Sequence, residues 1–139
     1  EMIRLAREDD TPAIIQGLLA LRPLTGWALY DRPGYDESSL TYFLYKRMAD
    51  PRSVLYVWDA GASISAFCGG SLDRFYLPPH MPLVFEWGWW GPPREAVQCY
   101  QAVARWGKRH GAELIGHVKA RPGMQANAIH EHIVWKVIR

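Results

Sequence analysis

Residues 83–90 read LVFEWGWW, and residues 91–96 directly after them read GPPREA. The first stretch is apolar on both of its alternating faces except at Glu86, which is typical of a central strand covered on both sides. The second stretch places proline where helices often begin, and apolar residues then recur at helical spacing. A covered strand that leads into a long helix predicts a parallel connection to the next strand, at 114–118. The strand and the helix are expected to meet through four buried side chains, Phe85, Trp89, Tyr100 and Val103.

The rest of the chain supplies strands and helices in a definite order. A short alternating stretch opens the chain, and a capping Asp-Asp-Thr-Pro follows it at residues 9–12. Pro23 is expected to end the helix that begins there. The predicted order is β-α-α-β-β-β-α-β-α-β, a mixed α/β sheet. Strands are expected at 2–7, 53–58, 63–72, 83–90, 114–118 and 133–138. Helices are expected at 37–49 and 124–131, and two further helices are expected to end at residues 22 and 110.

Length and charge narrow the class of protein. At 139 residues the chain is expected to form one domain over residues 2–139. A net charge of +2, with scattered basic residues, does not favour nucleic acid as a partner. No apolar run is long enough for a membrane helix, and the start lacks a signal-peptide pattern, so we expect a cytoplasmic protein. Cys68 and Cys99 lack metal-ligand spacing and are interpreted as buried thiols.

Aromatic side chains are the unusual feature of the composition, with seven Trp and seven Tyr. Three of them, Trp27, Tyr30 and Tyr35, fall in a loop predicted at 24–36. They could line a substrate pocket, plug it, or form a patch that binds a protein, and the sequence does not rank these alternatives.

Three stretches carry a resemblance to a known family. Residues 2–14 read MIRLAREDDTPAI, residues 54–70 contain VLYVW and SAFCGG, and residues 105–112 read RWGKRHGA. Together with the order of elements, they make the chain similar to the Gcn5-related N-acetyltransferases (GNAT) over nearly its whole length. The resemblance implies the GNAT fold, acetyl-CoA as acetyl donor and an amine, on a small molecule or a protein, as acceptor.

The family holds the pyrophosphate of acetyl-CoA with a loop of the form Arg/Gln-x-x-Gly-x-Gly/Ala at the start of its third helix. Glycines let the backbone approach the phosphates, whose charge the amides at the helix N-terminus bind. Here residues 91–96 are shorter than that pattern, Pro92 and Pro93 have no amide hydrogen, and Glu95 adds a negative charge that Arg94 offsets in part. The resemblance implies that the coenzyme is bound by Trp89, Trp90, Arg94, Glu95, Ala96, Val97 and Asn127.

Glu86 lies where many family members place the general base that deprotonates the amine. A carboxyl group in an apolar strand has a raised pKa, which suits that role near neutral pH. The alternative is a buried glutamate paired with an arginine. Gly88 fits either the strand bulge at which the family separates two parallel strands or a glycine required by packing.

The family's usual general acid is a tyrosine in the fourth helix, and no tyrosine follows Tyr100. His130 and His132 are candidates for that role, because imidazole titrates near neutral pH, or they are solvated surface residues. Their H-x-H spacing has no third ligand nearby, so no metal is expected.

Two functions remain open at this point. The first is an acetyl-CoA-dependent N-acetyltransferase with Glu86 as base and the acceptor entering beside Trp27, Tyr30 and Tyr35. The second is a GNAT-shaped protein without turnover, such as a phage genome could encode, that binds a partner protein through its aromatic loop. A homodimer is compatible with either function.

Overall fold

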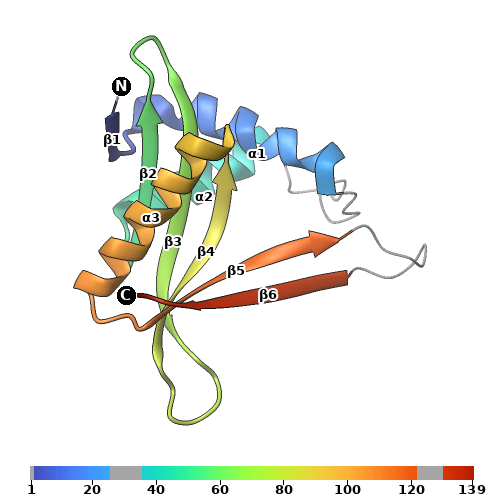
Figure 1. Ribbon diagram of the computed structural model, residues 1–139. Coiled ribbons are helices and arrows are strands. Elements are labelled where there is room, and N and C mark those ends of the chain that lie inside the picture. Colours follow the sequence, from blue (N-terminus) through green and yellow to red (C-terminus); the bar gives the residue numbers. More distant parts are fainter. Residues whose placement is uncertain (1, 26–35, 122–129) are drawn as a thin grey trace.

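The computed structural model describes residues 2–25, 36–121 and 130–139, and within them one mixed sheet has helices on both faces (Figure 1). The strands lie side by side in chain order. They are β1 (Met2–Leu5), β2 (Ser53–Asp59), β3 (Ile64–Arg74), β4 (Pro82–Trp90), β5 (Leu114–Arg121) and β6 (His130–Val137). The helices are α1 (Thr11–Thr25), which follows the short 3-10 turn η1 (Glu8–Asp10), α2 (Glu37–Ala49) and α3 (Pro93–Arg109). The predicted mixed α/β architecture is therefore confirmed.

Among the six described strands, one pair of neighbours, β4 and β5, is parallel, and the paired segment is short. Leu83–Phe85 of β4 lie opposite Leu114–Gly116 of β5, and all other neighbouring strands run antiparallel. Beyond these residues β5 turns away from β4 together with β6 (Figure 1). The prediction that these two strands run parallel and then diverge is confirmed, because α3 returns the chain to the same end of the sheet.

Two apolar cores fill the spaces between the sheet and its helices. On one face α3 packs on the sheet, with Cys68, Val84, Val103 and Trp106 among the buried residues. On the other face α1 and α2 pack around Phe67, which has no exposed surface. Removal of the apolar side chains of these two cores from water is the main contribution to the stability of the fold.

An ionic cluster joins the first strand to the start of α1. The Arg4 guanidinium donates to both carboxylate oxygens of Asp10, at 2.7 and 3.0 Å, and to Asp59 of β2 at 2.8 Å. The hydrogen bonds from Arg4 hold the pKa of Asp10 below its usual range. The predicted acidic start of this helix thus also anchors β1 to the sheet.

Two of the expected helices differ from the prediction, and β1, β3, β5 and β6 differ from it by a few residues at their ends. Helix α1 runs through Pro23 to Thr25, because a proline in the last turn removes one backbone hydrogen bond without ending the helix at once. The short helix expected at 124–131 lies mostly outside the described residues, and its last two positions, His130 and Glu131, begin β6 as extended backbone.

Phe85 points away from α3, contrary to the prediction, because β4 contains a β-bulge. Gly69 of β3 pairs with Gly88, while Gly70 pairs with Glu86, so Trp87 has no partner and the alternation of side chains shifts there. Trp89 therefore faces α3, but Phe85 points to the opposite face and contacts Trp135, with 6.4 Å between ring centroids. The expected packing of Phe85 against α3 is wrong, whereas Tyr100 and Val103 are buried as predicted.

Truncation of two phenylalanines separates these environments. We expect Phe67→Ala to lower the free energy of unfolding by about 3–5 kcal/mol, because Phe67 fills the core under α1 and α2. Phe85 is only half-buried, so Phe85→Ala should cost less than half as much. Chemical denaturation of both variants measures the difference, and a larger loss for Phe85→Ala would contradict the facing described here.

Candidate active site

The second half of β4 provides the candidate site. Since β5 pairs only with Leu83–Phe85, the edge of Glu86–Trp90 that faces β5 has no strand partner among the described residues. The bulge at Trp87 directs Glu86 and Trp89 to the α3 side of the sheet, while Trp90 points to the other side and stacks on Phe67 at 6.2 Å between centroids. Of the two tryptophans expected at the coenzyme, only Trp89 therefore faces α3.

Glu86 is a buried carboxyl group without a counter-charge. Its side chain is 8% exposed, and within the described parts of the chain no hydrogen bond or ion pair reaches it. Removal from water disfavours the charged form and raises the pKa of Glu86 to about 8. In the described residues no arginine forms an ion pair with Glu86, so the alternative interpretation of a glutamate paired with an arginine has no support there.

Two weaker acids lie near Glu86 under α3. Burial, reinforced by the charges of Cys68 and Glu86, raises the pKa of Tyr100 to about 12. Burial, together with the charges of Glu86 and Cys99, raises the pKa of the Cys68 thiol well above its usual value. Tyr100 and Cys68 therefore keep their protons to a higher pH than Glu86, so Glu86 is the first of these three groups to ionise and become able to accept a proton.

Two residues that the sequence did not assign to the site, Tyr100 and His117, form an aromatic group with Trp89 on the side of the sheet that Glu86 faces. The rings of Trp89 and Tyr100 stack with centroids 4.7 Å apart, and the Tyr100 hydroxyl lies 3.2 Å from Nδ1 of His117 on β5. The Trp89 and His117 rings meet edge to face at 5.8 Å. In the sequence, His117 differs from its neighbours only in being a polar residue within the otherwise apolar start of β5.

A hollow of about 310 Å³ lies where β4 passes into α3. The lining residues are Trp89, Trp90, Gly91, Pro93, Ala96 and Val97. The indole N–H of Trp89 donates to the Ala96 carbonyl at 2.7 Å, which fixes the strand to the first turn of the helix. Gly91 has a φ of +132° and approaches Ala66 so closely that a Cβ atom would lie 2.4 Å from that side chain. Four residues expected at the coenzyme thus surround one hollow.

The start of α3 offers few backbone donors. The Ala96 amide donates to the Pro92 carbonyl at 2.9 Å, and Pro93 has no amide hydrogen. Within the first turn this leaves the amides of Arg94 and Glu95, beside the exposed Arg94 side chain. Two helix amides and one guanidinium are therefore the groups in the first turn of α3 that can bind an anion.

Several candidate residues lie where their side chains are not described. Trp27, Tyr30, Tyr35 and Asn127 fall outside the described residues, so their roles remain predictions. His130 and His132 lie on β6, opposite Arg121 and Lys119 of β5.

Among the described residues, no three His, Cys, Asp or Glu side chains are grouped as metal ligands. No helix in the same parts of the chain is long and apolar enough to cross a membrane.

Comparison with solved structures identifies the fold. No protein-family model matches the sequence, and no curated protein is significantly similar to it. An N-acetyltransferase from Staphylococcus aureus superposes with a TM-score of 0.68 at 15% identity, over 88% of this chain and 75% of that one. An aminoglycoside 6′-N-acetyltransferase from Acinetobacter haemolyticus gives 0.62 at 16% identity, over 91% and 82%.

A third structure was solved with the acetyl donor. This protein from Clostridium acetobutylicum, described as a predicted acetyltransferase with acetyl-CoA, gives a TM-score of 0.63 at 16% identity, over 85% of this chain and 80% of that one. The chain therefore has the fold of the GNAT acetyltransferases, as its sequence indicated. Function in this fold depends on the residues of the site and not on the fold alone.

Proposed function

We propose that the protein is an N-acyltransferase that transfers an acetyl group from acetyl-CoA to an amine, with Glu86 as general base. The observation that carries the proposal is Glu86 itself, an unpaired carboxyl group with a pKa of about 8 on the strand edge that β5 leaves open. A buried carboxyl group costs stability, so its presence at this edge favours a chemical role over a structural one.

When bound, acetyl-CoA would supply an acetyl group activated as a thioester; the C–S bond would break as the amide bond forms, and coenzyme A would leave as the thiol with the second proton of the amine. The chain's own contribution begins with the acceptor, which arrives as an ammonium ion and must lose a proton before its nitrogen can form the new amide bond. Glu86 would accept that proton when it is ionised, and its raised pKa makes it a stronger base than an ordinary carboxylate. The proton must then return to solvent before the next cycle.

The start of α3 would hold the phosphates. The amides of Arg94 and Glu95 and the Arg94 guanidinium would supply the hydrogen bonds, and Trp89, fixed to Ala96, would form a wall of the hollow. Two prolines in place of amide donors make this a weak phosphate site, so we expect an affinity well below that of a complete glycine loop.

Calorimetry with acetyl-CoA tests the proposal. We expect weak binding by the unaltered protein and about fivefold weaker binding by Arg94→Ala, because a charge-assisted contact to phosphate is lost. Arg105→Ala is the matched control, since Arg105 is exposed on the same helix, away from its first turn. Absence of binding at about millimolar acetyl-CoA would contradict the proposal.

One observation favours a second function, a binding protein without turnover. Pro92 and Pro93 remove two phosphate donors, and the stacked rings of Trp89 and Tyr100 occupy part of the space between β4 and β5. In that case the GNAT fold would serve as a scaffold for a protein partner. The same calorimetry distinguishes the two functions, because only the acyltransferase requires acetyl-CoA to bind.

A further inference from the structure

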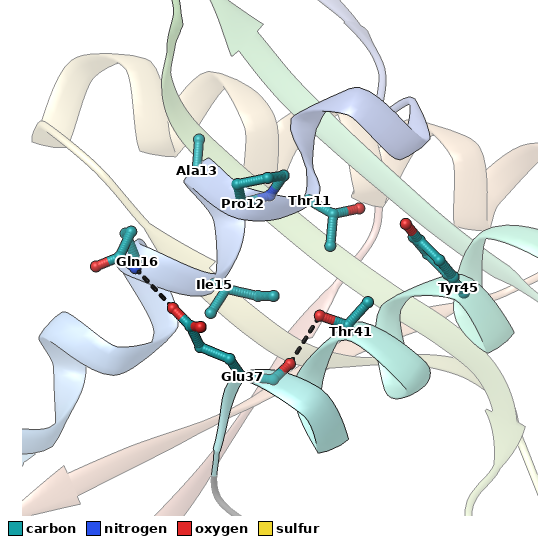
Figure 2. Close-up of a pocket in the computed structure, with 8 residues that line it drawn as sticks. All are labelled: Thr11, Pro12, Ala13, Ile15, Gln16, Glu37, Thr41 and Tyr45. Atoms are coloured by element: carbon teal, nitrogen blue, oxygen red, sulfur yellow. Dashed lines mark hydrogen bonds between the residues drawn. The ribbon is translucent and has the colours of Figure 1, made fainter.

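A second hollow, of about 380 Å³, lies between α1 and α2 and has no part in the proposed acyl transfer (Figure 2). These two helices cover the sheet face opposite α3, whereas Glu86 points toward α3. The lining residues are Thr11, Pro12, Ala13, Ile15 and Gln16 of α1 and Glu37, Thr41 and Tyr45 of α2. All of them belong to the described parts of the chain.

Thr11 is one of the residues around this hollow, and its hydroxyl group is buried and lacks a partner. The residue is 2% exposed, and its Oγ1 atom has no hydrogen bond. Figure 2 shows this hydroxyl turned toward the side of the hollow where the Tyr45 hydroxyl lies. A buried hydroxyl without a hydrogen bond destabilises the folded state, and native proteins rarely contain one without a reason. A ligand that supplied the missing hydrogen bond would be such a reason.

The other polar groups of the hollow select for positive charge. Glu37 is the one charged residue of the lining, and its carboxylate accepts a hydrogen bond from Gln16 Nε2 at 3.3 Å, which leaves its other oxygen available. The Thr41 hydroxyl donates to the Glu37 carbonyl at 2.7 Å, so its oxygen lone pairs can still accept (Figure 2). The lining is therefore rich in acceptors, while Pro12, Ala13 and the Tyr45 ring provide apolar surface.

From this arrangement we propose that the hollow between α1 and α2 binds a small primary ammonium ion that carries a compact apolar body. The ammonium group would donate to the hydroxyls of Thr11 and Thr41, and the negative charge of the Glu37 carboxylate, which is directed toward Gln16 at one side of the hollow (Figure 2), would attract it. The apolar body would lie against Pro12, Ala13 and the exposed ring of Tyr45, which can also attract a cation over its face. This ligand site does not depend on the acyltransferase activity.

Titration with benzylammonium chloride, followed by amide NMR spectra of the whole protein at neutral pH, tests the site. We expect shifts in the first turn of α1 and along α2, with a Kd of about millimolar, as suits a ligand of this size. Benzyl alcohol has nearly the same shape without the charge and should bind about tenfold more weakly. Equal binding of the two probes, or shifts confined to other parts of the chain, would overturn the proposal.

Two variants separate a ligand site from a structural one. Glu37→Gln should reduce benzylammonium affinity about tenfold, to the level of benzyl alcohol, while Glu113→Gln, at an exposed site elsewhere, should leave it unchanged. Thr11→Val should weaken binding and at the same time raise Tm, because it removes a buried hydroxyl that has no partner. Unchanged affinity in either hollow variant, or a lower Tm for Thr11→Val, would overturn the proposal.

Discussion

Glu86→Gln is expected to lower kcat for acetyl transfer by about a hundred- to ten-thousand-fold, the usual effect of removing a general base. Acetyl-CoA affinity should change little, because the carboxyl group acts on the amine and lies apart from the start of α3. Steady-state rates with an amine acceptor, together with calorimetry of acetyl-CoA, measure the two effects separately. Glu113→Gln provides a matched control at an exposed glutamate.

The pH dependence of the rate belongs to the same expectation. Glu86 accepts a proton only when ionised, and its pKa is about 8, so kcat/KM should rise with pH and level off above about pH 8. If coenzyme binds and Glu86→Gln is as fast as the unaltered protein, Glu86 is not the base. His130 or His132 would then be the next candidates.

The second large effect concerns stability. Glu86 has a pKa of about 8 in the folded protein and about 4.3 in an unfolded chain. Between these values the folded state retains a proton that the unfolded state has lost, so its stabilising effect is complete below about pH 4 and disappears as pH rises through 8. The free energy of unfolding should therefore fall by roughly 3–5 kcal/mol between pH 5 and pH 9.

Denaturant unfolding at several pH values, with Glu86→Gln as comparison, checks this. The variant cannot ionise at that position, so its stability should vary much less over the same range. Asp10 and Asp59 have lowered pKa values, and their contribution is lost only as the pH falls below about 4, outside this window. Parallel curves for the two proteins would mean that Glu86 is not held in an apolar environment.

Much of the fold could be predicted from local patterns. The apolar stretch at 83–90, interrupted only by Glu86, became the central strand, and the prolines after it began α3. The direction of Phe85 could not be predicted, because a simple alternation places it on the same face as Trp89. The bulge at Trp87 depends on pairing with Gly69 and Gly70, which are distant in the sequence.

The family resemblance pointed to Trp89, Trp90, Ala96 and Val97, which line one hollow, whereas the residue types alone indicated the candidate site only at Glu86. Glu86 is recognisable in the sequence as a charged residue in an apolar strand. Whether a counter-charge lies beside it depends on which side chains the neighbouring strands and α3 place around it, and the sequence does not show this. His117 was missed because one histidine in a short strand has no motif. The hollow between α1 and α2 has no sequence signal either, since Thr11, Glu37 and Tyr45 are ordinary helix residues that become a group only when the two helices pack.

The order of strands along the sheet, which is the order of the chain, has a consequence for how the protein folds. Each strand from β2 onward pairs with the strand that precedes it in the chain, so its partner has already been synthesised when it emerges. The sheet from β1 to β4, with α1 and α2 on one face, can assemble while β5 and β6 are still being synthesised. These last strands then join the sheet through the three parallel pairs at the start of β4, once α3 has brought the chain back to that end.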